Sequence, residues 1–335
     1  MAIITGKHNV QQVYREAQDR GWVLPCFNSE NLTTTEAILS TVQEHGDEIG
    51  IPNLPIIIGI TVLYDERPQA VHYTNTHRWD TGLQLFMEEL QVLAGAGGPY
   101  ENLQVLIHLD HIIHEKDSGL LQWDLSRFSS IMYDASKLPI EENCEVTAQF
   151  VQNYGHLLLV EGACDEIAEY GDGQSGDLTT ADQVERYYRT TGVDMVVANL
   201  GTEHRASSSD LKYRGDYARQ IKERIGPKLV LHGGSSVKEA EIKHLADDGI
   251  CKVNIWTLLE REASTVLFEH MVRNASKVAG FAALERLRQE GYLGFAAAGS
   301  SRGPDLDYFT TAARQRLVYC TMKRIIKNYL KMWYI

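Results

Sequence analysis

Eight short apolar runs, separated by longer amphipathic segments, constrain the fold of this chain more than any other feature. The runs are rich in Val, Ile and Leu on both faces, which is typical of parallel strands covered by helices. They occupy residues 23–28, 54–61, 103–110, 129–134, 157–163, 195–201, 228–234 and 251–257. Eight β-α units in succession predict an α/β fold of the (β/α)₈ TIM barrel type.

A doubly wound open sheet is the alternative architecture. Such a sheet usually has fewer strands and needs a glycine-rich turn after its first strand. Residues 26–32, CFNSENL, follow that position here and contain no glycine. We therefore expect the 335 residues to form a single barrel domain, with its core at about residues 20–260 and a helical C-terminal extension at about 263–335.

Composition excludes several classes of partner. The net charge is −13 and the chain has no Lys/Arg-rich run, which argues against binding to nucleic acid or to an anionic membrane surface. The longest apolar stretch, residues 54–64, is too short to span a membrane, and the N-terminal residues lack the pattern of a signal peptide. The five cysteines form no C-x-x-C pair, so we expect reduced core residues and a cytoplasmic protein.

Histidines follow three of the predicted strands, where barrels place their functional side chains. They are His111, His204 and His232. A single histidine in such a position is more often a neutral core residue, but three of them around one rim predict a metal site. Three imidazoles with an open fourth position are typical of catalytic zinc, although several other divalent metals accept the same ligands.

Other polar groups surround these histidines. Asp110 directly precedes His111 and is close enough to act as acid and base, while His108 is better suited to orient its neighbours through hydrogen bonds. Glu161 ends the fifth run and is an accessory candidate. His114 is most simply a solvated loop residue.

A glycine-rich turn after the seventh run predicts a phosphate site. Residues 232–236 read HGGSS, so the backbone amides of Gly233, Gly234 and Ser235 are available to an anion, with Asn254 and Thr257 at the end of the eighth run. Barrels commonly hold phosphate at this place. Most Gly-Gly-Ser turns are only turns, and the adjacent histidine is what strengthens the prediction.

Several motifs occur in order over about residues 20–260: CFNSENL, HLDH, SSIMYDASKLPIEEN, LVEGA, TTGVDMVVANLGTEH, LVLHGGSS and GICKVNIWT. Together they resemble the class II, zinc-dependent fructose-bisphosphate and tagatose-bisphosphate aldolase family. The resemblance implies an aldehyde-lyase with one Zn²⁺ per chain. Such an enzyme cleaves a ketose 1-phosphate or 1,6-bisphosphate reversibly to dihydroxyacetone phosphate and an aldehyde.

The resemblance also implies roles for individual residues. Zinc would be held by His111, His204 and His232, Asp110 would transfer the proton of the C4 hydroxyl, and Thr61 would approach the substrate. The family's tendency to dimers and tetramers implies a homodimer or homotetramer.

This chain departs from the family at four positions near the site, which are Ala163, Arg205, Ser236 and Trp256. These changes leave the metal chemistry in place and alter the pocket, so the reaction type is predicted more firmly than the substrate. The acidic stretch 164–177 matches a family loop that supplies a further acid, with Glu169 and Asp172 as candidates. A solvated acidic loop is an equally good interpretation.

Three alternatives stay open. The chain could be a non-catalytic barrel subunit that partners such an aldolase, although it keeps the three histidines and Asp110. It could be an aldolase for a different, non-phosphorylated sugar or sugar acid. A zinc hydrolase ranks last, because the first predicted strand has no H-x-H motif and a hydrolase needs no phosphate site.

Overall fold

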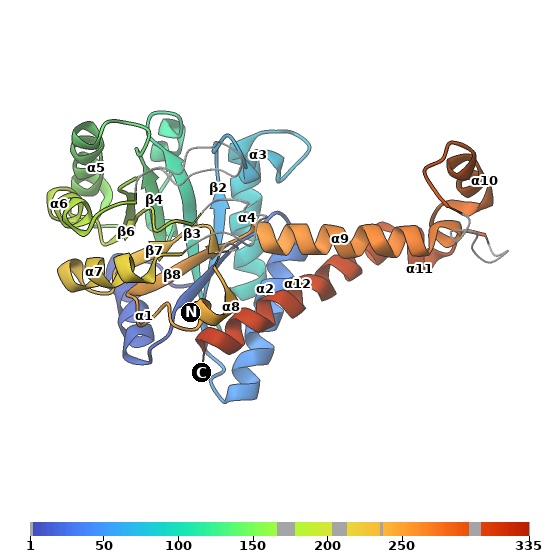
Figure 1. Ribbon diagram of the computed structural model, residues 1–335, viewed down its shortest axis with the longest axis horizontal. Helices are drawn as coiled ribbons and strands as arrows, with labels where there is room; N and C mark the ends of the chain where they lie inside the picture. Colours follow the sequence, from blue (N-terminus) through green and yellow to red (C-terminus); the bar gives the residue numbers. More distant parts are fainter. Residues whose placement is uncertain (1–2, 166–177, 203–212, 235–236, 295–302, 335) are drawn as a thin grey trace.

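The computed structural model describes residues 3–165, 178–202, 213–234, 237–294 and 303–334. It confirms the predicted barrel: eight parallel strands lie in chain order, and β8 pairs with β1 to close the sheet (Figure 1). The strands are β1 (Leu24–Asn28), β2 (Pro55–Thr61), β3 (Gln104–Ile113), β4 (Ser130–Asp134), β5 (Leu159–Ala163), β6 (Met195–Val197), β7 (Leu229–Leu231) and β8 (Ile250–Ile255).

Helices cover the outside of the barrel, the first one before β1 and the others between consecutive strands. They are α1 (Lys7–Asp19), α2 (Leu32–Ile49), α3 (Gln69–His72), α4 (Trp79–Ala94), α5 (Ile140–Tyr154), α6 (Ala181–Thr191), α7 (Gly215–Ile225) and α8 (Glu239–Ile242), with two 3₁₀ turns at Ser118–Gln122 and Leu125–Arg127. Their ends follow local sequence signals. Asn31 caps α2 by accepting from the amides of Thr33 and Thr34, and Thr180 forms a capping box with Gln183 at α6.

Three strands end earlier than predicted. β6 stops at Val197 and β7 at Leu231, and glycines with positive φ lie in the segments that follow: φ is 79° at Gly201 and 67° at Gly233. β8 stops at Ile255, and Thr257 is the first residue of α9 rather than the last of a strand. The carboxyl ends of these strands are therefore turns whose side chains face the mouth of the barrel.

The C-terminal extension is helical, as predicted, and forms an arm that projects from the barrel (Figure 1). Its long helices α9 (Thr257–Arg273) and α12 (Thr311–Trp333) pack against each other, and α12 also packs along α2. The shorter helices α10 (Ala275–Gln289) and α11 (Leu306–Phe309) lie at the distal end. None of the helices within the described residues combines the length and apolar character needed to cross a membrane.

Candidate active site

An irregularity in β3 brings two neighbouring side chains to the mouth of the barrel. The pairing of β3 with β4 shifts register between Leu109 and Ile112, and His111 within this bulge has a φ of 46°. A left-handed conformation is uncommon for a residue other than glycine. In a regular strand consecutive side chains point to opposite faces, whereas a bulge re-aims them. Asp110 and His111 can therefore both serve the same site.

His111 is held in one orientation by a carboxylate and a tyrosine ring. Its Nδ1 lies 2.8 Å from the Oδ2 of Asp134 at the end of β4, and Tyr64 stacks on the imidazole with ring centroids 4.4 Å apart. Burial lowers the pKa of His111, but the charges of Asp110 and Asp134 outweigh burial and raise it. A carboxylate that accepts from Nδ1 fixes the tautomer and leaves Nε2 directed at the site.

His232 completes a donor set at the end of β7. Its ring meets that of His111 edge to face, with centroids 4.9 Å apart. One ligand atom from each of Asp110, His111 and His232 lies within 4.8 Å of the others, and all three residues are buried. The two imidazoles fit a divalent cation of the zinc type, with the Asp110 carboxylate directly beside it. His204, the predicted third imidazole, lies outside the described residues, as do Arg205, Ser235, Ser236, Glu169 and Asp172.

Asp110 is fully buried and accepts hydrogen bonds from three side chains. The donors are Nδ2 of Asn28, Nδ2 of Asn254 and Nη2 of Arg67, each at 2.9 Å. Burial would raise the pKa of Asp110, but the charges of His111, His232 and Arg67 and the contact with His108 hold it well below its ordinary value. The carboxylate is therefore ionised and oriented, as a proton acceptor must be.

A buried polar network lies beneath this carboxylate. The Nζ of Lys252 in β8 donates to both carboxylate oxygens of Glu161, at 2.7 and 2.9 Å, and lies 2.9 Å from Nε2 of His108. Nδ1 of His108 lies 2.8 Å from the Oγ of Ser130. Burial lowers the pKa of Lys252, but Glu161 outweighs it, so the lysine is charged. Both nitrogens of His108 are thus engaged, which fits the predicted orienting role rather than metal ligation.

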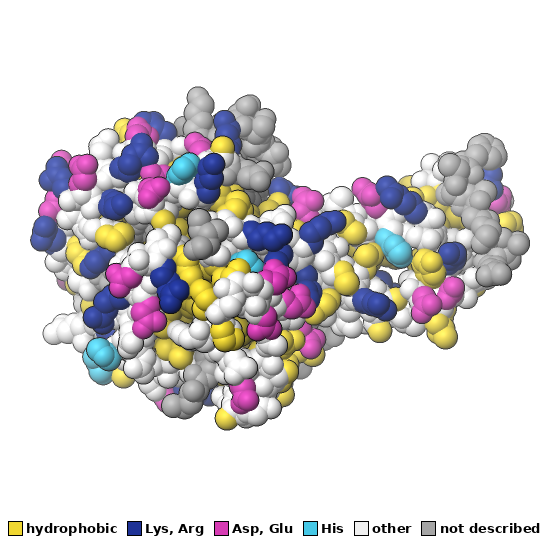
Figure 2. All heavy atoms as spheres, turned by 90° about the horizontal axis from the view of Figure 1, so that it is seen from below, with side chains coloured by type: hydrophobic (Ala, Val, Ile, Leu, Met, Phe, Trp, Pro, Cys, Tyr) yellow, Lys and Arg dark blue, Asp and Glu magenta, His cyan; other side chains and the backbone are white. Residues whose placement is uncertain are grey.

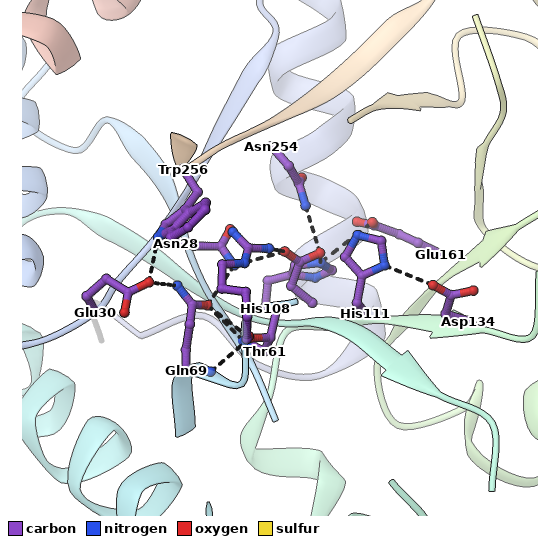
Figure 3. Close-up of polar contacts among 12 residues, drawn as sticks. Asn28, Glu30, Thr61, Gln69, His108, His111, Asp134, Glu161, Asn254 and Trp256 are labelled. Atoms are coloured by element: carbon purple, nitrogen blue, oxygen red, sulfur yellow. Dashed lines mark hydrogen bonds and ion pairs between the residues drawn. The ribbon is translucent and has the colours of Figure 1, made fainter. Parts of the chain in front are cut away.

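Two predicted substrate contacts have other partners in the structure. The hydroxyl of buried Thr61 donates to the carbonyl of Arg67 and accepts from the backbone N–H of Gln69, so it fixes the β2–α3 loop. Figure 3 shows Thr61 next to Gln69. The sequence predicts that Asn254 binds phosphate; in the structure its Nδ2 donates to Oδ1 of Asp110 at 2.9 Å.

The remaining phosphate candidates keep their place at the strand ends. Gly233 has a φ of 67°, and a Cβ on Gly234 would lie 2.8 Å from Cγ1 of Val253. Both positions therefore require glycine. Thr257 begins α9 directly after β8.

Sequence reasoning missed several residues of the site, chiefly Asn28, Arg67, Asp134 and Lys252. A signal existed for three of them: Asn28 and Asp134 end apolar runs, and Lys252 is a charge inside one. Arg67 gave no signal, because it lies in a loop whose path only the folded chain defines.

The closed barrel carries these buried polar groups at the carboxyl ends of its strands, which is where barrel enzymes carry out their chemistry. A more specific statement follows from comparison with known families. The family model described as Fructose-bisphosphate aldolase class-II matches residues 8–298, and the chain belongs to that family.

Solved structures share the fold of this chain. The fold is similar to that of fructose-bisphosphate aldolase from Campylobacter jejuni, with a TM-score of 0.74 and 17% identity, covering 99% of this chain and 96% of that one. The YdjI aldolase from Escherichia coli K12 gives a TM-score of 0.65 at 19% identity, covering 97% and 96% of the two chains. A putative fructose-1,6-biphosphate aldolase from Coccidioides immitis gives 0.66 at 18% identity, covering 97% and 95%. Family and fold together support an aldolase, an aldehyde-lyase, as the class of enzyme.

Proposed function

We propose that the protein is a metal-dependent aldolase that cleaves a ketose 1-phosphate or ketose 1,6-bisphosphate reversibly to dihydroxyacetone phosphate and an aldehyde. The observation that carries the proposal is the triply hydrogen-bonded Asp110 carboxylate, which lies within 4.8 Å of the ligand atoms of His111 and His232. We also propose a cytoplasmic location, since all five cysteines are free and thiols persist in a reducing compartment.

The cation would be held by His111, His232 and, by prediction, His204. Zn²⁺ suits this donor set best, and other divalent metals accept it. When bound, such an ion supplies Lewis-acid polarisation of the substrate ketone. Asp134 keeps His111 in the required tautomer through its 2.8 Å contact with Nδ1.

Asp110 performs the proton transfer. In the cleavage direction it accepts the proton of the C4 hydroxyl while the C3–C4 bond breaks. The C4 oxygen becomes the aldehyde carbonyl, and the electron pair of the broken bond stays on the three-carbon donor. In the condensation direction the same carboxyl returns the proton. Asn28 and Asn254 fix the carboxylate plane for this transfer.

The donor's phosphate would bind at the strand 7 and strand 8 ends. Gly233 and Gly234 lack side chains and so allow an anion to approach their backbone closely, and Ser235 and Thr257 would add hydroxyl donors. A non-catalytic barrel subunit is disfavoured because such a subunit has no use for an ionised buried carboxylate beside two imidazoles.

Retro-aldol cleavage of a panel of ketose 1-phosphates and 1,6-bisphosphates tests the proposal, with release of dihydroxyacetone phosphate as the readout. We expect release that chelation abolishes and added Zn²⁺ restores. His232→Ala should lose both metal content and activity while remaining folded. Full activity in that variant, or no release from protein shown to contain metal, would contradict the proposal.

A further inference from the structure

Arg67 brings a cationic side chain to the catalytic carboxylate from a loop. It lies between β2 and α3, where the hydroxyl of Thr61 donates to its carbonyl and fixes the backbone. Its side chain is only 13% exposed, and Nη2 is 2.9 Å from Oδ2 of Asp110. The guanidinium is therefore part of the active site and is held there by the fold of the loop.

Trp256, one of the departures from the family pattern, forms a wall for this guanidinium. The Cζ of Arg67 lies 4.7 Å from the centroid of the indole ring, a cation–π contact that fixes the plane of the guanidinium. The indole is itself held, because its Nε1 donates to Glu30 at 2.5 Å and Nε2 of Gln69 donates to the same oxygen at 2.7 Å (Figure 3).

Most of the hydrogen-bonding capacity of Arg67 is left for a ligand. A guanidinium has five N–H donors. Within the described residues, Asp110 is the one hydrogen-bond acceptor that the Arg67 side chain contacts. None of the Arg67 nitrogens is among the buried polar atoms without a partner, so the remaining donors reach accessible space. A partly buried, oriented guanidinium with spare donors is the usual means of binding an oxyanion.

We propose that Arg67 is an anion-binding residue that selects an aldehyde half carrying a carboxylate close to the cleaved bond. This inference rests on the proposed aldolase function. Asp110 must contact the C4 hydroxyl, and the guanidinium is 2.9 Å from the same carboxylate, so an anion on Arg67 lies near C4. The planar fork pairs with a carboxylate through two parallel hydrogen bonds.

A carboxylate matches the local charge better than a phosphate. Arg67 contributes one positive charge, which its ion pair with Asp110 partly offsets, and Lys252, the other cation described in the site, is buried and neutralised by Glu161. A phosphate ester carries more negative charge and more acceptor oxygens than one guanidinium can satisfy. The substrate class would then be a sugar acid with a phosphorylated three-carbon donor half.

Condensation of dihydroxyacetone phosphate with three matched aldehydes tests the inference. They are tartronate semialdehyde, glyceraldehyde and glyceraldehyde 3-phosphate, which differ only in a terminal carboxylate, hydroxymethyl or phosphate ester. The wild-type protein should give its highest kcat/KM with the carboxylate. Arg67→Gln should lower that value about 100-fold, mainly through KM, because an oriented charge pair is lost. The loss for glyceraldehyde should be less than about tenfold.

Matched variants guard against indirect effects. Arg67→Lys keeps the charge without the fork and should recover only part of the selectivity. Arg78→Gln removes an arginine whose side chain is 68% exposed and pairs with Asp80, so it should change nothing. Thermal unfolding of each variant checks that the fold persists.

Three other outcomes would contradict either the role of Arg67 or the aldolase function. A wild-type preference for glyceraldehyde or its phosphate would overturn the inference while leaving the aldolase function intact. An equal loss with all three aldehydes in Arg67→Gln would show that Arg67 serves Asp110 alone, and would overturn it as well. Absence of condensation with every aldehyde, in metal-loaded protein, would refute the aldolase function itself.

Discussion

At the scale of single residues, Asp110 owes its properties to neighbours from three separate parts of the barrel. Asn28 ends β1, Asn254 lies in β8 and Arg67 belongs to the β2–α3 loop. The charges of His111, His232 and Arg67 outweigh burial and keep the pKa of Asp110 low. The three donors hold the carboxylate in one orientation as a fixed acceptor.

Asp110→Asn tests this role with little change of shape. The amide cannot accept the C4 hydroxyl proton, so we expect kcat to fall by about 10²- to 10⁴-fold. Metal bound through His111 and His232 should be retained, and the circular dichroism spectrum should be unchanged. Steady-state kinetics together with metal analysis check both points, and a variant with near wild-type kcat would remove Asp110 from the mechanism.

Lys252 carries a second prediction at this scale. Lys252→Met leaves the buried carboxylate of Glu161 without its partner, and breaking a buried pair in this way costs about 3–5 kcal/mol. Adding Glu161→Gln should restore much of the lost stability, because the uncompensated charge is then gone. Urea unfolding of both proteins measures the difference, and a loss below about 1 kcal/mol in the single variant would show that Glu161 finds another partner.

The sequence predicts the site residues that lie at strand ends, but not those that lie in loops. Two apolar runs carry polar residues at their ends: His108, Asp110 and His111 at one, and His232 at the other. Parallel strands in a barrel bring such residues together. Arg67 reaches Asp110 only because the β2–α3 loop folds back over the mouth. A loop path depends on tertiary contacts that no periodicity records.

At the scale of elements, all eight predicted strands are present and their ends are the least predictable part. Apolar runs fix where a strand is buried, whereas the residue at which it leaves the sheet depends on cross-strand pairing. The bulge in β3 at His111 is such a case, since it exists only relative to β4. The sequence predicts the helical extension but not its projection from the barrel. The pattern of residues within a helix does not show which other helix it will pack against.

The first turn of α9 carries a pH prediction. Burial and then the nearby Glu30 raise the pKa of Glu260 to about 7. Within the described part of the chain, its buried Oε1 has no hydrogen-bond partner. Because the folded pKa lies above the unfolded value of about 4.3, the fold favours the protonated form. The contribution of Glu260 to stability is therefore full below the unfolded pKa of about 4.3. It is lost as the pH rises through the folded pKa of about 7.

Glu260→Gln should remove this dependence. The variant keeps the shape of the protonated acid, so it should match the wild type near pH 4 and become progressively more stable than it towards pH 7. Free energies of unfolding measured in urea at several pH values give the comparison. Parallel curves for the two proteins would show that Glu260 titrates normally.

At the scale of the whole molecule, the arm carries several large apolar side chains that are exposed to solvent. Phe268, Phe281, Tyr292 and Leu306 are between 67% and 78% exposed. Figure 2 shows hydrophobic side chains along the arm among charged ones. Large apolar side chains exposed in one region among charged ones are found at protein–protein contacts. This surface supports the prediction that the protein is a homodimer or homotetramer assembled through the arm.

Charged substitutions on the arm test that prediction. Phe268→Glu and Phe281→Glu place a carboxylate on the proposed contact, where burying an unpaired charge opposes association. We expect the double variant to sediment as a monomer at concentrations at which the wild type is a dimer or tetramer. Val92→Glu is the matched control, because Val92 is 71% exposed on α4 of the barrel and its substitution should leave the assembly intact. A monomeric wild type would refute the prediction outright. An assembly that persists in the double variant would show that the subunits contact each other through the barrel and not through the arm.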